Sequence, residues 1–358
     1  MPILCKQDMT AARDHGLIDI EGITEINATS LDVRIGQLLT PSQDRKDMKE
    51  VPLIDGEYWL LKPGDFFLYE TVERFRFSHW FHGKINSRSS WARYGVASAD
   101  VHDEFSEPHG DFYGKVICSI RTLGTTVKIR PGDTIAQAHI AFGGFIPALD
   151  DVLREEIKTG QLKITRRGKE IQRLVQTFAI DEGYKVGAKV PGGRKMNSGF
   201  TLTHDPIIKI YTGEVIDPKE PSPTWFKERR LANRGTYIKA GTFFLSASAE
   251  EVSIDKHFVG WVHEWNHLMP TSGYVGPGIH EYSRHSSLQT HAGAPKIDPF
   301  PRFSGKITFE NYAMTDVTIR PGERLADFHL YYLHSPWELE DKDKSQYNEQ
   351  TGATDSRL

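Results

Sequence analysis

Short runs of Val, Ile, Phe, Tyr and Thr recur along the chain, separated by Gly or Pro-Gly turns, as in "LLKPGDFFLYE" and "VKIRPGDTIAQAHIAF". Such runs between turn residues are typical of antiparallel strands in a sandwich or barrel. Apolar residues recur at helical spacing only in "KQDMTAARDHG" near the start and "PALDDVLREEIKTG", residues 147–160. The pattern predicts an all-β fold with a few short helices.

The strand pattern itself repeats. "LLKPGDFFLYETVERFRF" around Gly64 returns as "YIKAGTFFLSASAEEVSI" around Gly241, 177 residues later, and Gly36 and Gly213 have the same spacing. "FYGKVICSI" and "FSGKITFEN" lie 191 residues apart. The second copy therefore carries an insertion of about fourteen residues, consistent with an elaborated surface loop. Several blocks in one order argue against chance similarity and predict a tandem duplication.

A chain of 358 residues suits two domains that each bury a core. The Gly-rich stretch around residues 178–195 lies where the first copy should end. We therefore expect a first domain at residues 1–185 and a second at residues 186–358.

Charge and cysteine content limit the possible ligands and the cellular compartment. Lys and Arg number 44 against 48 Asp and Glu, a net charge of −4, so nothing suggests a general nucleic-acid or membrane surface. The two cysteines, Cys5 and Cys118, suggest neither a disulfide framework nor a cysteine metal site. No run approaches the roughly 20 apolar residues of a membrane span, and the first residues lack a signal pattern. We expect a soluble cytoplasmic protein.

An ordered set of motifs adds a family resemblance. "INATSLDVRIG", "RSSWARYGV", "HAGAPKIDP", "FSGKITFE", "IRPGERLADF" and "YNEQTGATDSRL" together resemble the dCTP deaminases of the dUTPase superfamily, over nearly the whole chain. The resemblance implies two tandem dUTPase-like domains, each a distorted, jelly-roll-like β-barrel. In that family the catalytic pocket forms between neighbouring subunits of a trimer, with a serine-arginine motif from one subunit and a base loop and glutamate from another.

Each half retains a different part of that pocket. The serine-arginine motif is present in the first half, whereas the 177-residue spacing puts Trp-Asn-His, residues 265–267, at its place in the second. The family's glutamate falls on Glu310, five residues after Gly305, whereas Ser119 follows Gly114 at that distance in the first half. These complementary losses predict one composite site per chain.

The resemblance assigns a role to each motif. Glu310 is the expected general base and acid, and Ser89 is expected to hold the attacking water. Arginine forks suit phosphate, and backbone groups of the base loop read the cytosine edge. The substrate-binding residues are expected to be Arg88, Ser90, Arg93, His291, Ala294, Lys296, Asp298 and, in the tail, Tyr347 and Gln350. Without the resemblance, these residues also fit a turn serine, solvated surface arginines and a strand glutamate.

Two departures from the family pattern fall in these motifs. Lys296 stands where the family has an arginine, and Gln346 where it has a lysine before the tail tyrosine. A lysine lacks the planar fork, which leaves the role of Lys296 open.

Zinc is not expected, because the HxE and PCxxC motifs of zinc deaminases are missing. The triphosphate would bring Mg²⁺, held mostly by phosphate oxygens and water. The expected ligands are dCTP and dUTP, without nucleic acid or membrane, and a homo-oligomer stays open.

Three functions compete. The leading one is hydrolytic deamination of dCTP to dUTP and ammonia. The second is a bifunctional deaminase that also cleaves the triphosphate, or a dUTPase; the motifs "IDPFPRFSG" and the tail disfavour a pure dUTPase. The third is a catalytically silent nucleotide sensor, against which the complementary losses argue.

Overall fold

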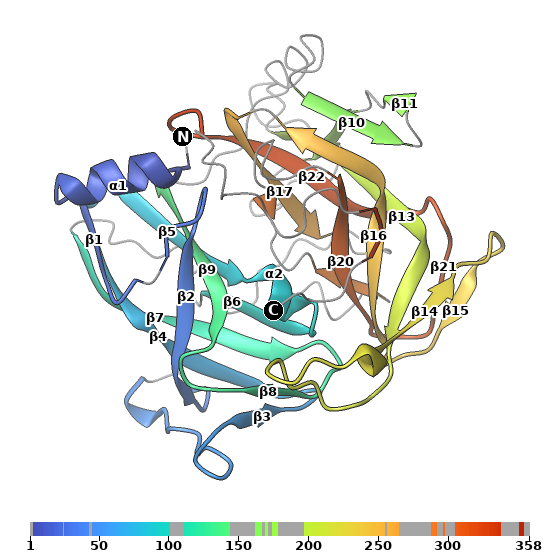
Figure 1. The fold of residues 1–358 in the computed structure, drawn as a ribbon, viewed down its shortest axis with the longest axis horizontal. Coiled ribbons are helices and arrows are strands. Elements are labelled where there is room, and N and C mark those ends of the chain that lie inside the picture. The colour runs from blue at the N-terminus through green and yellow to red at the C-terminus, as the bar shows by residue number, and fades with distance from the viewer. Residues whose placement is uncertain are drawn as a thin grey trace.

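Strands dominate the computed structural model, as the alternating pattern predicts (Figure 1). The helices are few and short: α1 Lys6–Asp14, α2 Ser89–Ala92, and the 3-10 turns η1 Arg45–Asp47 and η2 Pro223–Trp225. Helix α1 lies inside the predicted "KQDMTAARDHG" segment, and the helix predicted at 147–160 falls outside the described residues. The structure describes residues 3–23, 25–42, 45–100, 111–143, 162–166, 169–170, 174–177, 197–254, 256–264, 288–291, 296–297, 305–337 and 351–353.

The first sheet closes into a barrel. Its order is β1-β4-β2-β9-β5-β6-β7, and β7 also pairs with β4, so every strand except β1 belongs to a closed ring. Strict alternation along β5 buries Phe81, Gly83, Ile85 and Ser87 and turns the residues between them outward. The strands are β1 Ile18–Glu21, β2 Leu31–Leu39, β4 Phe66–Phe77, β5 Phe81–Ser87, β6 Val96–Asp100, β7 Phe112–Thr122 and β9 Thr134–Phe142, with a separate pair β3 Trp59–Leu61 and β8 Val127–Ile129.

The second sheet has the same central order. Its path runs β18-β20-β16-β13-β22-β17-β19, and β10, β11, β12 and β14 attach along its edges. The strands are β10 Leu162–Arg166, β11 Lys169–Glu170, β12 Leu174–Thr177, β13 Asn197–Tyr211, β14 Phe226–Arg230, β16 Phe243–Ile254, β17 Phe258–Glu264, β18 Leu288–His291, β19 Lys296–Ile297, β20 Gly305–Ala313 and β22 Arg324–Tyr332, with a separate pair β15 Thr236–Ile238 and β21 Val317–Ile319.

The two sheets share strand registers as well as strand order. In the first, Phe66 of β4 lies opposite Arg121 of β7; in the second, Phe243 of β16 lies opposite Tyr312 of β20. These pairs have the 177- and 191-residue spacings of the sequence repeat. Both ladders shift register at the same point, between residues 70 and 74 and between residues 247 and 251. The repeat is therefore visible in the strand pairing; its origin by duplication stays a prediction.

One predicted correspondence is wrong. In β2, Asp32 lies opposite Gln137 of β9, and the equivalent pair in the second sheet is Thr201 and Asp327. The spacing between these first strands is thus 169 residues instead of 177. Gly36 therefore corresponds to a position between His204 and Ile208 and not to Gly213, because the two strands are equivalent at a shorter spacing than the glycine pattern suggests.

The second sheet also begins before the expected boundary at residues 185 and 186. Strand β10 pairs with β16 as β1 pairs with β4: Leu162 lies opposite Ile254, and Ile18 opposite Phe77. Strand β12 pairs with β13 as well. Residues 162–177, expected in the first domain, thus pair with strands of the second sheet, and the boundary between the two domains stays a prediction.

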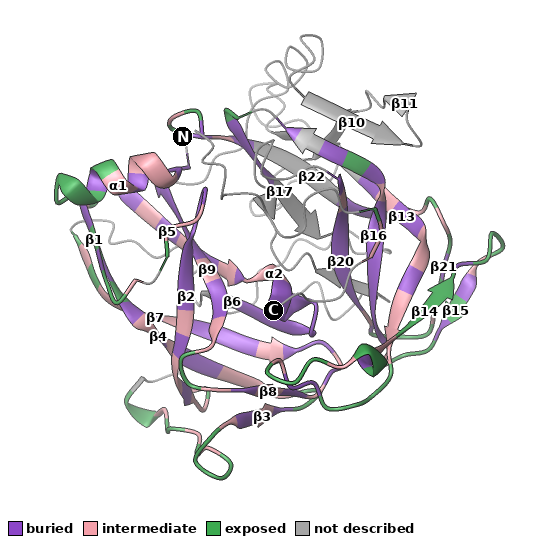
Figure 2. Cartoon of the chain, viewed as in Figure 1, coloured by how far each residue is buried: buried purple, intermediate pink, exposed green. Residues whose placement is uncertain are grey.

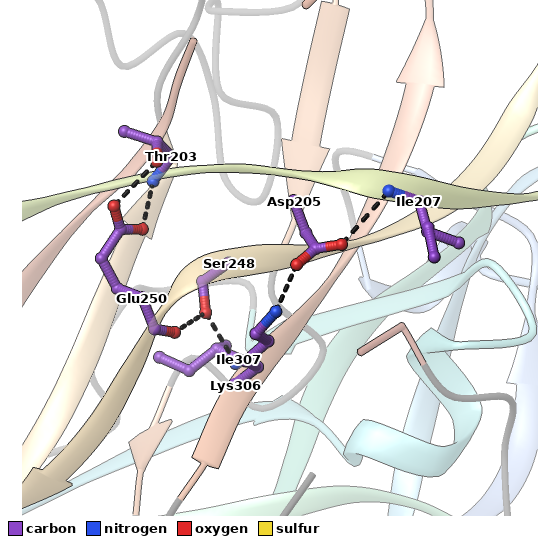
Figure 3. Close-up of polar contacts among 7 residues, drawn as sticks. All are labelled: Thr203, Asp205, Ile207, Ser248, Glu250, Lys306 and Ile307. Atoms are coloured by element: carbon purple, nitrogen blue, oxygen red, sulfur yellow. Dashed lines mark hydrogen bonds and ion pairs between the residues drawn. The ribbon is translucent and has the colours of Figure 1, made fainter. Parts of the chain in front are cut away.

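A buried polar clasp fixes the register shift of the second sheet (Figure 3). Glu250 accepts hydrogen bonds from the backbone N and Oγ1 of Thr203 at 2.7 and 2.8 Å. Ser248 Oγ donates to the Glu250 carbonyl at 2.6 Å and accepts from the Ile307 backbone N at 2.9 Å. A bulge leaves backbone groups outside the ladder, and these side chains supply their partners.

The first sheet carries an equivalent clasp, with Arg34 in place of Thr203 and Thr71 in place of Ser248. Glu73 accepts from the Arg34 backbone N at 2.9 Å and from Arg34 Nε at 2.8 Å. Thr71 Oγ1 donates to the Glu73 carbonyl at 2.8 Å and accepts from the Val116 backbone N at 3.1 Å. The clasp recurs in both sheets because both bulges need it, which identifies it as part of the fold.

The two sheets lie side by side, with α2 near the middle of the view in Figure 1. Ile216 forms a parallel bridge with Val127, and the buried carboxylate of Asp217 takes a bidentate contact from Arg130, with both distances 2.8 Å. Ile3 bridges both Ala141 and Leu333. Backbone pairing, together with the ion pairs of Asp217 with Arg130 and Lys128, thus helps to join the halves. Cys5 and Cys118 are both buried, and neither forms a disulfide.

Candidate functional site

The serine-arginine motif forms one tight turn of helix at the end of β5. Arg88 is the N-cap residue of α2, with extended backbone, and its N donates to the Ile135 carbonyl of β9 at 2.9 Å. Trp91 lies in the core of the first barrel and contacts the Tyr94 ring edge-on, with centroids 6.1 Å apart. The buried Trp91 thus anchors the turn, and the turn fixes the backbone of the motif.

The four polar residues of the motif differ in exposure. Ser90 is buried and Ser89 half-buried, while Arg93 is only 5% exposed. The Arg88 side chain is 29% exposed, and its Nη1 lies 3.5 Å from Oδ2 of the buried Asp32. Of the two arginines of this motif, Arg88 is therefore the one that is accessible to a ligand. It is also in contact with the Asp32 carboxylate of β2.

Glu310 lies in the middle of β20 and is 1% exposed. It lies opposite Leu245 of β16 on one side and opposite His291 of β18 on the other. A carboxylate in such a protected position can exchange protons with a bound reactant without competition from bulk water. The predicted general base is thus located on a buried central strand.

The strand register shows which way Glu310 faces. Residues directly opposite in an antiparallel ladder, and those two positions away, share one face. Glu310 therefore shares a face with Leu245, Phe243 and Tyr312. Figure 2 shows the described parts of β16 and β20 as largely buried.

That face contacts the first half of the chain. Phe243 and Leu245 form an apolar cluster with Ala97 of β6 and Leu123, and β6 follows α2 directly. The Tyr312 ring packs so closely on Gly124 that a Cβ at Gly124 would lie 2.5 Å from it. The face that carries Glu310 thus lies against the segment that follows the serine-arginine motif, within one chain.

The remaining predicted site residues are only partly placed. His291 belongs to β18 beside Glu310, and Lys296 of β19 pairs with Trp261; nothing is described of these side chains. Ala353, near the chain end, packs against the apolar cluster of Ala97 and Leu245. Four predicted substrate-binding residues lie outside the described part of the chain: Ala294, Asp298, Tyr347 and Gln350.

Sequence reasoning missed the role of Asp32. Its carboxylate accepts from Asn27 Nδ2 at 2.9 Å and Gln137 Nε2 at 3.4 Å, both on Oδ1, and meets Arg88 through Oδ2. Asp32 belongs to the motif "INATSLDVRIG", but its contact with Arg88 spans 56 positions and leaves no local pattern in the sequence.

The described residues offer no metal site and no membrane helix. Within these segments, no three His, Cys, Asp or Glu side chains gather into a metal-binding group. No helix in those segments is long and apolar enough to cross a membrane.

Known proteins resemble this chain in sequence. A family model described as "dCTP deaminase-like" matches residues 3–142. "dCTP deaminase, dUMP-forming" from Dictyoglomus thermophilum is 31% identical over 174 residues, which are 47% of this chain and 79% of that protein. The protein of the same name from Methanosphaera stadtmanae is 24% identical over 203 residues, 52% of this chain and 100% of that protein. "dCTP deaminase" from Aeropyrum pernix is 28% identical over 144 residues, 37% and 78% of the two chains.

A solved structure resembles the fold of both halves. The chain of "2'-deoxycytidine 5'-triphosphate deaminase" from Agrobacterium tumefaciens superposes with a TM-score of 0.65 and 12% sequence identity. The match covers 94% of this chain and 99% of that one. One solved chain thus shares the arrangement of both sheets.

Proposed function

Because this chain belongs to the dCTP deaminase family, we propose that it hydrolyses dCTP to dUTP and ammonia at one site shared by its two halves. The observation that carries the proposal is the placement of Glu310, buried on the face of β20 that lies against the segment after the serine-arginine motif. Two relatives match about half of this chain over most of their own length, which fits one family subunit per half.

The chemistry needs a water at C4 of cytosine and a proton for N3 and then for the departing amine. Glu310 takes one proton from the attacking water and passes it to N3, then takes the second from the new C4 hydroxyl and passes it to the departing amine, so no net proton leaves the site. The Ser89 hydroxyl holds the water. Ammonia leaves from C4, and the oxygen of the water becomes the O4 of uracil. On this account the enzyme is a hydrolase that needs no zinc.

The substrate contacts come from both halves. Arg88, Ser90 and Arg93 bind the triphosphate, and backbone and side-chain groups of the base loop, His291, Ala294, Lys296 and Asp298, bind the base and sugar. Tyr347 and Gln350 close the tail over the nucleotide. Mg²⁺ enters with the triphosphate on its phosphate oxygens. Cytoplasmic location and a homo-oligomer remain predictions.

A second candidate is a bifunctional enzyme that also cleaves the triphosphate and forms dUMP. The names of the Dictyoglomus and Methanosphaera relatives, both "dUMP-forming", favour it. In that case a second water hydrolyses the dUTP formed at Glu310 to dUMP and pyrophosphate before release.

One assay separates the candidates. The protein is incubated with dCTP and Mg²⁺, and ammonia, dUTP, dUMP and pyrophosphate are followed together. Ammonia with dUTP identifies a deaminase, and ammonia with equal dUMP and pyrophosphate identifies the bifunctional enzyme. Nucleotide binding without any product would contradict both and identify a sensor. A parallel reaction with dUTP alone tests for a dUTPase.

A further inference from the structure

The ion pair between Asp32 and Arg88 joins two distant parts of the first barrel. Asp32 is on β2, and Arg88 caps α2 directly after β5. Strand β9 lies between β2 and β5 in the sheet. Asp32 lies opposite Gln137 of β9, which in turn lies opposite Asn86 of β5, two residues before Arg88. The contact between the Asp32 carboxylate and Arg88 therefore reaches across β9, from β2 to the end of β5.

The hydrogen bonds of Asp32 orient its carboxylate. Asn27 Nδ2 and Gln137 Nε2 both donate to Oδ1, at 2.9 and 3.4 Å, and Arg88 Nη1 lies 3.5 Å from Oδ2. A guanidinium has five N–H donors, so a contact at one end leaves the others available for a second anion. The 29% exposure of the Arg88 side chain gives such an anion access.

The Asp32–Arg88 pair differs from the polar contacts of the fold, because those contacts are present in both sheets and this pair is present in one. The Glu73 clasp recurs as the Glu250 clasp, with the same hydrogen bonds. The Asp32 pair does not recur: the ladder register puts Thr201 at the place of Asp32, and residue 265, at the place of Arg88, is a tryptophan. The carboxylate is thus present only in the half that carries the serine-arginine motif.

We propose that Asp32 is a positioning residue, which holds the Arg88 guanidinium in the orientation that binds the substrate triphosphate. The inference rests on the proposed function, since it takes Arg88 as a phosphate ligand. An arginine that is already ordered loses less side-chain freedom when the nucleotide binds. Asp32 itself does not touch the nucleotide.

The decisive variant is Asp32→Asn, which keeps the shape and removes the charge. The new amide must point its NH₂ either at Arg88 or at Asn27 and Gln137, so one donor then faces another donor in either orientation. If Asp32 orients Arg88, the Kd for dCTP should rise by about 2- to 10-fold, the range expected for ordering one long side chain. If Asp32 merely offsets the charge of Arg88, the same variant should bind dCTP more tightly, which would overturn the proposal.

The readouts distinguish positioning from general damage. Calorimetric binding of dCTP should weaken in Asp32→Asn, binding of deoxycytidine, which lacks phosphate, should not change, and kcat should stay within about twofold while KM rises. The matched control is Glu73→Gln, a buried carboxylate with its own arginine in the same sheet. It should lower the melting temperature without changing the Kd for dCTP. Equal weakening of deoxycytidine and dCTP would contradict the proposal.

A double-mutant cycle keeps the test valid if Asp32→Asn is unstable. Once Arg88→Ala is present, adding Asp32→Asn should have no further effect on dCTP affinity, because the residue to be positioned is gone. Additive losses would overturn the proposal. If wild-type protein binds dCTP without deaminating it, the proposed function fails while this binding test still applies.

Discussion

Glu310 and Ser119 occupy equivalent places in the two sheets, opposite Leu245 and Leu68, and both are buried. Only the carboxylate can accept and return a proton during hydrolysis. At this shared backbone position, the two halves therefore differ in whether the side chain can do the proton transfer that the proposed hydrolysis requires.

Replacing Glu310 with Gln should abolish deamination and retain nucleotide binding. The amide has nearly the same shape but cannot take the proton from the attacking water. Ammonia release and calorimetric binding of dCTP measure the two effects separately. Near wild-type turnover would remove Glu310 from the mechanism. Ser119→Glu serves as the control and should create no second activity, because the first half lacks the base loop.

At the scale of single elements, the bulge clasp predicts a specific loss of stability. Glu250→Ala removes the acceptor of the Thr203 backbone N–H, and leaving a buried donor unsatisfied costs about 1 to 3 kcal/mol of unfolding free energy. Urea denaturation measures this cost. The control is Glu251→Ala, at the exposed neighbouring position, which should change stability by less than about 0.5 kcal/mol. Equal effects of the two variants would show that the clasp does not stabilise the bulge.

Local sequence patterns predicted single strands and helices well. They predicted less well which strand of one half corresponds to which strand of the other. The alternation in "FHGKINS" and the helical spacing in "KQDMTAARDHG" are properties of adjacent residues, and both correspond to observed elements. Helix α2 has four residues, too few to show a period. The correspondence of Gly36 with Gly213 was wrong because a glycine marks a turn without specifying which strand pairs with which.

In the candidate site, too, contiguous motifs could be predicted from the sequence and contacts between strands could not. Each motif is a contiguous run of residues. Asp32 escaped notice because its partner Arg88 comes from another strand, and a contact across β9 depends on the sheet order. The direction in which Glu310 faces likewise depends on the β16–β20 register and cannot be read from "GKITFE" alone.

At the scale of the whole molecule, Asp217 links the halves and should make stability depend on acid. Hydrogen bonds from Arg130 hold the pKa of Asp217 well below its ordinary range. Because the folded-state pKa is depressed, this stabilisation is fully present above the ordinary value, about 4, and is lost as pH falls toward the folded-state pKa.

Asp217→Asn should therefore lower the unfolding free energy by about 1 to 3 kcal/mol at pH 7, since it leaves Arg130 without its charged partner. The difference from wild type should shrink as pH falls below about 4, because Asp217 in the unfolded wild-type chain then binds a proton that the folded protein still excludes. Denaturation at several pH values measures both. Asp14→Asn, at an exposed position, is the control and should show little loss. A loss that does not vary with pH would exclude the ion pair as its cause.

The contact of the Glu310 face with Ala97 in the same chain leads to the last prediction. Arg93→Ala should weaken nucleotide binding, by about 2 to 5 kcal/mol if its charge meets the triphosphate in a buried site. Glu310→Gln should instead stop turnover. Neither protein alone should release ammonia at an appreciable rate, since each has lost one part of the site. Arg88→Ala is the alternative if the buried Arg93 proves necessary for folding.

Mixing the two inactive proteins then tests where the site forms. If the first and second halves of one chain build it, each chain still holds one broken site, so the mixture should stay inactive after prolonged incubation at any ratio. If the site forms between chains, subunit exchange would pair an intact first half with an intact second half and return a fraction of the activity. We expect no recovery, because Phe243 and Leu245 already pack the Glu310 face against Ala97 and Leu123 within one polypeptide. Recovered ammonia release would show that the intramolecular contact is structural and that the active pairing is made by a neighbouring chain.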